Sequence, residues 1–254
     1  MIEMYLGLHS GGWAVDGRTR GWAAHTAPAL GLAHWAQEIE QQHASRWRRA
    51  RVSLWLSGGL ARPFLTGPVE GLTTWSEADA MAAAAAPQAT GFDGPCRVRL
   101  EDWPGDAATL GTAIEESFAL AIDEVARARR ITWLSVRPRW AAAIDEALGQ
   151  RPSTSIVAFA DADALTLLGG APPHEAGTTS PAFDMAATYA PAPTGERAAA
   201  LWLRTLLSRD VRAEDASFLR MSTPLAETTD TLAPADGRGA RWPGAVRLSE
   251  EGTS

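Results

Sequence analysis

The feature that most constrains the fold is a β-hairpin pattern that opens the chain and recurs in its second half. Tyr5–Trp22 is typical of an extended strand, a Gly-Gly turn, a second short strand and a further turn at Asp16-Gly17. Residues 155–168 have the pattern of two strands around a turn at Asp161-Ala-Asp163. Strand-like and helix-like runs alternate between these hairpins, so we predict an α/β fold with mixed sheets.

Apolar spacing predicts the remaining elements. Helices are expected over 30–49, 77–86, 109–130, 140–148 and 196–208, and strands over 51–56, 97–103, 131–136, 183–189 and 216–221. Ser76 is the expected N-cap of the second helix, and Ala199, Leu203, Leu206 and Leu207 are expected to face inward on the last. The two hairpin openings indicate two ribonuclease-H-like subdomains. We place the first at 1–150, a smaller second one at 151–248 and a flexible tail at 249–254.

Charge and composition exclude several classes of protein. The chain has 23 basic and 30 acidic residues, and 23 − 30 gives a net charge of −7, which argues against nucleic-acid binding and a general attraction to anionic lipid. Every basic residue is arginine, so P-loops and Schiff-base lysines are excluded. Cys96 is the only cysteine, which rules out an intrachain disulfide and a cysteine-based zinc site. The start of the chain lacks a signal-peptide pattern, so we expect a cytoplasmic protein.

Four segments follow one another along the chain in a characteristic order: Gly7–Gly12, Val52–Gly58, Ile131–Trp140 and Ala160–Thr166. In this order they resemble the elements of the actin-like ATPase superfamily, and most of all the PilM and GspL cytoplasmic proteins of type IV pilus and type II secretion machines. The resemblance covers most of the chain and implies two actin-like subdomains. In the ATP-binding members, the first turn and the second hairpin hold phosphate between them.

The first turn departs from the family's pattern. ATP-binding members have Asp-x-Gly followed by small residues, whereas His9, Gly11, Gly12 and Trp13 stand at the matching positions. A neutral histidine does not replace a carboxylate as a ligand of a hard cation. Asp161 matches the aspartate of the second phosphate loop. The resemblance therefore implies a degraded site with no cofactor, or ATP bound through Ser10, Gly11, Gly12 and Asp161.

Other candidate sites are weaker. The histidines His9, His25, His34 and His43 lack a zinc-binding spacing. Ser57-Gly58-Gly59 follows a strand but lacks the Gly-x-Ser-x-Gly pattern of a hydrolase. Trp13, Trp22 and Trp75 lie at predicted turns, where they either line a peptide-binding groove near arginines such as Arg62 or cap the ends of the core.

The sequence thus predicts a non-catalytic, cytoplasmic scaffold of a pilus or type II secretion-like machine. Its expected partner is a protein, the cytoplasmic segment of an inner-membrane component, which would place the chain at the membrane without insertion of its own. The alternative is an actin-fold ATP-binding protein with weak or no hydrolysis. A third possibility is an accessory subunit of an unrelated assembly that shares the fold.

Overall fold

The computed structural model describes residues 1–69, 71–101, 103, 108–150, 156–171, 182–193, 195–209 and 216–220. The predicted tail at 249–254 lies outside the described residues. Within the described part of the chain, no helix is both long and apolar enough to span a membrane.

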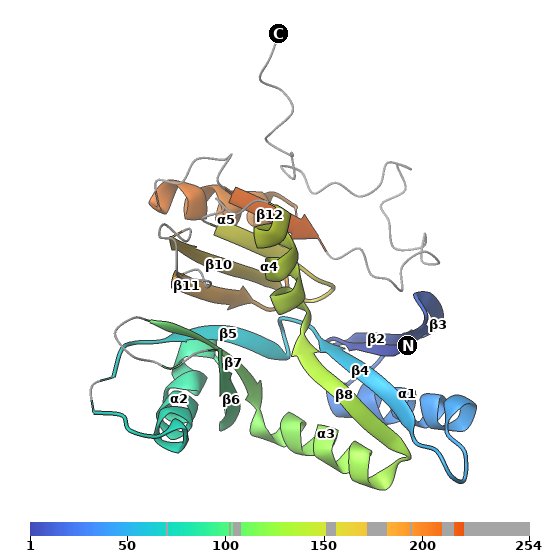
Figure 1. The fold of residues 1–254 in the computed structure, drawn as a ribbon. Helices are drawn as coiled ribbons and strands as arrows, with labels where there is room; N and C mark the ends of the chain where they lie inside the picture. The colour runs from blue at the N-terminus through green and yellow to red at the C-terminus, as the bar shows by residue number, and fades with distance from the viewer. Residues whose placement is uncertain are drawn as a thin grey trace.

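The first large sheet has five strands. They are β1 (Ile2–Leu6), β2 (Ser10–Val15), β3 (Arg18–Ala24), β4 (Ala50–Leu56) and β8 (Ile131–Pro138), in the order β3-β2-β1-β4-β8. β1 is antiparallel to β2 and parallel to β4, and β4 is parallel to β8. Helices α1 (Pro28–His43) and α3 (Glu116–Ala128) lie against one face (Figure 1). Trp13, Leu32 and Leu54 are fully buried in that layer.

The second large sheet repeats this scheme. Its strands are β9 (Ile156–Ala160), β10 (Leu165–Ala171), β11 (Ala182–Tyr189) and β12 (Ala216–Arg220), in the order β11-β10-β9-β12. β10 is antiparallel to both β9 and β11, and β12 is parallel to β9. Helix α5 (Gly195–Ser208) buries Trp202 and Leu206 against it. Each half is therefore an antiparallel meander extended by parallel strands, β4 and β8 in the first half and β12 in the second, which confirms the predicted pair of ribonuclease-H-like subdomains with mixed sheets.

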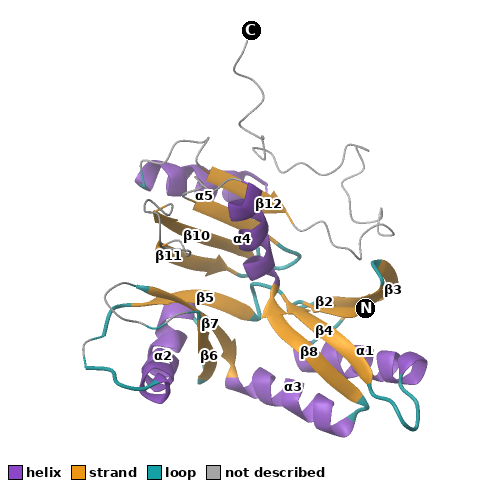
Figure 2. Cartoon of the chain, viewed as in Figure 1, coloured by secondary structure: helices purple, strands orange, loops and turns teal. Residues whose placement is uncertain are grey.

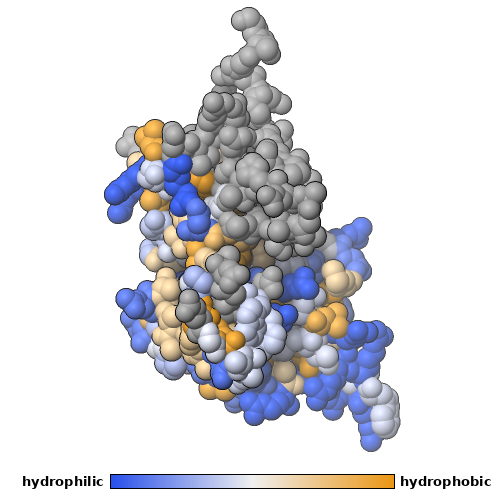
Figure 3. Space-filling view, turned by 60° about the vertical axis from the view of Figure 1, so that its left-hand side comes forward, coloured by the Kyte–Doolittle hydropathy of each residue, from blue (hydrophilic) through white to orange (hydrophobic). Residues whose placement is uncertain are grey.

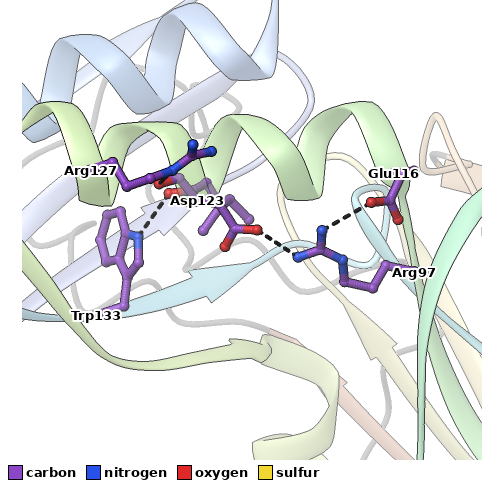
Figure 4. A network of polar contacts seen from close by, with 6 residues as sticks. Arg97, Glu116, Asp123, Arg127 and Trp133 are labelled. Carbon is purple, nitrogen blue, oxygen red and sulfur yellow. Dashed lines mark hydrogen bonds and ion pairs between the residues drawn. The ribbon is translucent and has the colours of Figure 1, made fainter. Parts of the chain in front are cut away.

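A small α/β unit is inserted between β4 and α3. It contains β5 (Ala61–Thr66), α2 (Trp75–Thr90), β6 (Cys96–Leu100) and β7 (Thr109–Glu115), with strand order β5-β7-β6 (Figure 2). Arg97 on β6 joins the unit to α3, because its guanidinium is 2.8 Å from Asp123 and 2.9 Å from Glu116 (Figure 4). On the same helix, the carbonyl of Ile122 accepts a hydrogen bond of 3.1 Å from the Trp133 indole.

Helix α4 (Arg139–Gln150) leads from β8 to the second sheet. Trp140, at its start, is 1% exposed and donates its indole N–H to the carbonyl of Ala61 at 2.7 Å. Its ring belongs to a buried cluster that includes Leu110 of the inserted unit and Phe159 and Leu168 of the second sheet. A buried cluster at α4 thus joins the inserted unit to the second sheet. The domain boundary at residue 150 stays a prediction.

Two predicted elements differ from the structure. Gly11 and Gly12 lie inside β2, and the first turn is instead Gly7–His9. The helix predicted over 109–130 begins only at Glu116, because residues 109–115 form β7. β7 is the middle strand of its sheet and is buried at Thr109–Ala113, so its apolar residues lack the alternation that identifies a half-exposed strand.

Helix ends and faces account for the other corrections. α1 ends at His43, and the arginines that follow it form a loop instead of a last helical turn. Thr74, not Ser76, is the N-cap of α2. On α5, Leu203 and Leu207 are 57% and 81% exposed, because Ala198, Trp202 and Leu206 occupy the inner face. The bulk of Trp202 sets which side of the helix is buried.

Candidate functional site

Three turns meet where the two halves join. They are Gly7–His9 between β1 and β2, Ser57–Gly59 after β4, and Asp161–Ala164 between β9 and β10. The amide of Gly7 donates to the carbonyl of Ser10 at 2.8 Å, which closes the first turn. The amide of Ser57 donates to the carbonyl of Leu6 at 2.9 Å, which fixes the second turn beside the first. The third turn comes from the second half and faces both.

Two carboxylates of the third turn bind backbone amides of the other two. Asp161 Oδ2 accepts a hydrogen bond of 2.6 Å from the amide of Gly58, while its Oδ1 accepts from the amides of Ala164 at 2.9 Å and Asp163 at 3.2 Å. Asp163 Oδ2 accepts a hydrogen bond from the amide of Leu8 in the first turn. Hydrogen bonds from amides to an ionised acceptor are among the stronger ones in proteins. The two halves are therefore joined by hydrogen bonds from backbone amides of the first half to aspartate side chains of the second.

The glycines of the first two turns allow this close approach. A Cβ at Gly7 would collide with the Asp163 carboxylate, and one at Gly58 would collide with the Thr166 hydroxyl. A Cβ at Gly59 would lie 2.7 Å from Leu8 Cδ1 and 3.0 Å from Asp163 Oδ1. A side chain at Gly7 or Gly58 would push the halves apart, and one at Gly59 would displace Leu8.

Burial and mutual repulsion govern the charge of this junction. Burial, and then the nearby charge of Asp163, raise the pKa of Asp161 to about 7, although the amides of Gly58, Asp163 and Ala164 oppose the shift. Burial also raises the pKa of Tyr5 well above its ordinary value, and both aspartates add to that effect. Asp161 is consequently a carboxyl group that changes charge near neutral pH.

Several buried polar atoms at the junction have no hydrogen-bond partner among the described residues. They are the hydroxyls of Tyr5, Ser57 and Thr166 and the Oδ1 atom of Asp163. A buried polar group without a partner costs about 1–3 kcal/mol. The junction therefore keeps unused hydrogen-bonding capacity. No group of three or more His, Cys, Asp or Glu residues suited to a metal ion occurs in the described part of the chain.

Of the four residues expected to bind a cofactor, only Asp161 makes one of these contacts with its side chain. Ser10 begins β2, with its carbonyl accepting the Gly7 amide. A Cβ at Gly11 would lie 2.9 Å from Leu6 and 3.2 Å from the Trp35 indole, and one at Gly12 would collide with β3 at Gly21. These two glycines thus make room for packing on the two faces of β2.

His9 and Trp13, which depart from the ATPase pattern, lie in different surroundings from each other. His9 is exposed at the first turn, and its carbonyl accepts the amide of His25 at 2.8 Å. Trp13 is fully buried in the core under α1. Sequence reasoning missed Asp163, Gly7 and Gly58 as members of the junction. The signal available was the pair of acidic residues in one turn, together with glycines that directly follow β1 and β4.

The arrangement of the halves decides the fold class. Two meanders, each with a parallel fourth strand, bring their first turns face to face across a shared junction. The fold is actin-like. No family model and no curated protein matches the sequence.

Solved structures of similar fold are known. One is a Bacteroides thetaiotaomicron protein with an actin-like ATPase fold and unknown function, at 11% identity and a TM-score of 0.49, covering 91% of this chain and 85% of that one. Another belongs to a PilM-PilN type IV pilus biogenesis complex, at 12% identity and a TM-score of 0.45, covering 83% and 66%. A third is the cytoplasmic domain of EpsL, an inner membrane component of the Vibrio cholerae type II secretion system, at 12% identity and a TM-score of 0.44, covering 90% and 87%.

Proposed function

We propose that this protein is a non-catalytic, cytoplasmic scaffold that binds the cytoplasmic segment of an inner-membrane protein in a pilus or type II secretion-like machine. The observation that carries the non-catalytic part is the junction. The amides of Leu8 and Gly58 donate to Asp163 and Asp161, where the turns of an ATPase would offer amides to phosphate. A phosphate chain would have to displace both carboxylates and then lie beside their negative charge.

The pilus or secretion setting of the proposal comes from the four sequence segments that resemble the PilM and GspL proteins, namely Gly7–Gly12, Val52–Gly58, Ile131–Trp140 and Ala160–Thr166. The surface that supports a binding role is β3, an edge strand of the first sheet with Arg18, Arg20, Ala23 and Ala24 exposed. An edge strand offers unpaired backbone groups to an extended segment of a partner, which adds as a further strand.

Whether the protein binds ATP is tested by thermal unfolding with millimolar Mg-ATP. A ligand at 100 times its Kd stabilises the folded state by about 2.7 kcal/mol, which is an easily measured rise in Tm. We expect no rise for the unmodified protein. A rise that Asp161→Ala abolishes and His9→Asp leaves in place would instead support the ATP-binding alternative.

The partner is tested by proximity labelling in the native cell, with the labelling enzyme fused to the full chain. Components of one envelope-spanning machine should be enriched relative to the free labelling enzyme. Enrichment of cytoplasmic proteins alone would contradict the proposed partner class, whatever the result with ATP.

A further inference from the structure

A short loop presents a tryptophan to solvent at one end of the first half. The loop covers residues 44–49 between α1 and β4 and projects at the lower right of Figure 2. Trp47 is 87% exposed, the largest exposed fraction among the large apolar side chains of the described residues. The guanidinium of Arg46 lies 5.0 Å from the centre of the Trp47 ring. A single bulky aromatic residue is thus held out into solvent between arginines.

The loop is anchored to the body of the protein. Ser45 and Arg48 exchange backbone hydrogen bonds of 2.9 and 3.3 Å, which makes the loop tight. Arg130 donates to the carbonyl of Ser45 at 3.1 Å. Arg49 donates to the carbonyls of Ala126 and Ile131, both at 3.2 Å. Three of these contacts tie the base of the loop to the end of α3 and the start of β8, so the exposure of Trp47 is a feature of the fold.

Positive charge gathers around this loop, although the whole chain has a net charge of −7. The loop, the start of β4, the end of α3 and the two residues before β8 contribute seven arginines, which together with Trp47 we call the basic pole: Arg46, Arg48, Arg49, Arg51, Arg127, Arg129 and Arg130. Hydrophilic residues also dominate the lower rim of the space-filling view (Figure 3).

Few carboxylates offset the basic pole. Glu40 lies 3.6 Å from Arg129 and accepts the amide of Arg130. Asp123 is paired with Arg97 of the inserted unit, and Glu124 is a further acidic residue near the end of α3 (Figure 4). Arg46, Arg48 and Arg51 have no carboxylate partner among the described residues. The pole therefore keeps an uncompensated positive field.

We propose that the basic pole docks directly on an anionic lipid surface, with Trp47 entering the headgroup region. Tryptophan is enriched at the interface between membrane and water, and arginines near anionic lipid each contribute about 1 kcal/mol. A protein partner of ordinary size would need about 800 Å² of complementary surface with an apolar centre. The loop offers one projecting ring instead, which suits a soft, negatively charged surface.

This docking goes beyond the proposed function, because it needs no protein partner. The acidic remainder of the chain is repelled by the same surface, so the molecule would bind in one orientation, with the pole toward the lipid. The binding is peripheral and involves no membrane-spanning segment.

The test is co-sedimentation of the purified full chain with vesicles of phosphatidylglycerol and phosphatidylethanolamine, compared with vesicles of phosphatidylcholine alone. We expect binding to the anionic vesicles only, weakening as salt screens the charges. Arg46→Gln combined with Arg48→Gln should weaken binding about 25-fold, since each arginine is worth a factor of about five. Arg197→Gln combined with Arg204→Gln, at two exposed positions of α5, makes the same change in net charge and should have no effect.

A second pair of variants separates the aromatic contact from the charge. Trp47→Ala should weaken binding to anionic vesicles and leave the Tm unchanged, whereas Trp75→Ala, at another exposed tryptophan, should not change binding. No binding to anionic vesicles, or equal weakening by the pole and α5 variants, would overturn the proposal. Capture of an acidic peptide by the pole without vesicle binding would overturn it as well. None of these results bears on nucleotide binding or the proposed protein partner.

Discussion

Asp161 makes the stability of the folded protein sensitive to pH. Its pKa is about 7 in the folded protein, whereas an aspartate in an unfolded chain has a pKa of about 3.9. Between these two pH values the folded state holds a proton that the unfolded state has released. The free energy of unfolding therefore falls as pH rises through this window and levels off above about pH 7.

Asp163→Asn should reduce this fall, because it removes the neighbouring charge that helps to raise the Asp161 pKa. The asparagine side-chain oxygen can still accept the Leu8 amide, so the junction keeps its hydrogen bond. The measurement is Tm at intervals from about pH 4 to pH 8, with Asp79→Asn, an exposed acid on α2, as the control. An unchanged pH profile in the Asp163 variant would show that the two carboxylates do not interact.

At the residue scale, the sequence predicted the turn at Asp161 but not what its carboxylates bind. The contact between Leu8 and Asp163 joins residues that are 155 positions apart. A short sequence pattern does not predict a contact between residues so far apart. The structural role of Gly11 and Gly12 is not predictable locally either, because two adjacent glycines indicate a turn. These two positions need glycine because Trp35 and β3 leave no room for a side chain. Those contacts form only when the sheet is assembled.

At the level of single elements, the N-cap of α2 can be tested directly. The Thr74 hydroxyl accepts the Glu77 amide at 3.3 Å, and the Glu77 carboxylate accepts the Thr74 amide at 3.0 Å, which is a complete capping box. Thr74→Ala removes the cap and should lower the free energy of unfolding by about 1 kcal/mol. Chemical denaturation measures the change.

The control for this prediction is Ser76→Ala. Ser76 was the residue expected to cap the helix, but it lies one position inside α2 and is exposed. Its replacement should change the free energy of unfolding by less than about 0.5 kcal/mol. A larger loss for Ser76→Ala than for Thr74→Ala would contradict the cap seen in the structure.

Element types were easier to predict than element limits. β4, β8, β9 and β11 lie within a residue or two of their predicted places, because short apolar runs between turns are distinctive. β7 was predicted as helix because Leu110 and Ile114 have helical spacing with α3. Pairing with β5 and β6 overrides that local preference, and such pairing is set by residues elsewhere in the chain.

At the scale of the whole molecule, the alternating order of elements and the second hairpin were enough to predict two similar halves. The inserted unit was not predicted as a separate layer, because its strands and helix continue the same alternation of strand and helix as the elements on either side. The structure shows why it matters. Its strand β5 lies against β11, and its residue Leu110 shares a buried cluster with both Trp140 and Phe159. The halves are thus connected through a third unit as well as through the turns.

Trp140 should couple the stability of all three parts. Trp140→Phe keeps an aromatic ring in the shared cluster but leaves the carbonyl of Ala61 without its indole donor, at a cost of about 1–3 kcal/mol. Because the cluster spans the inserted unit and the second sheet, hydrogen exchange should accelerate in both β5 and β9. Trp133→Phe removes a comparable indole bond, to Ile122, within the first half alone. That variant should accelerate exchange mainly in α3 and β8. If Trp140→Phe also accelerated exchange only close to its own position, and not in both β5 and β9, the two halves would unfold independently.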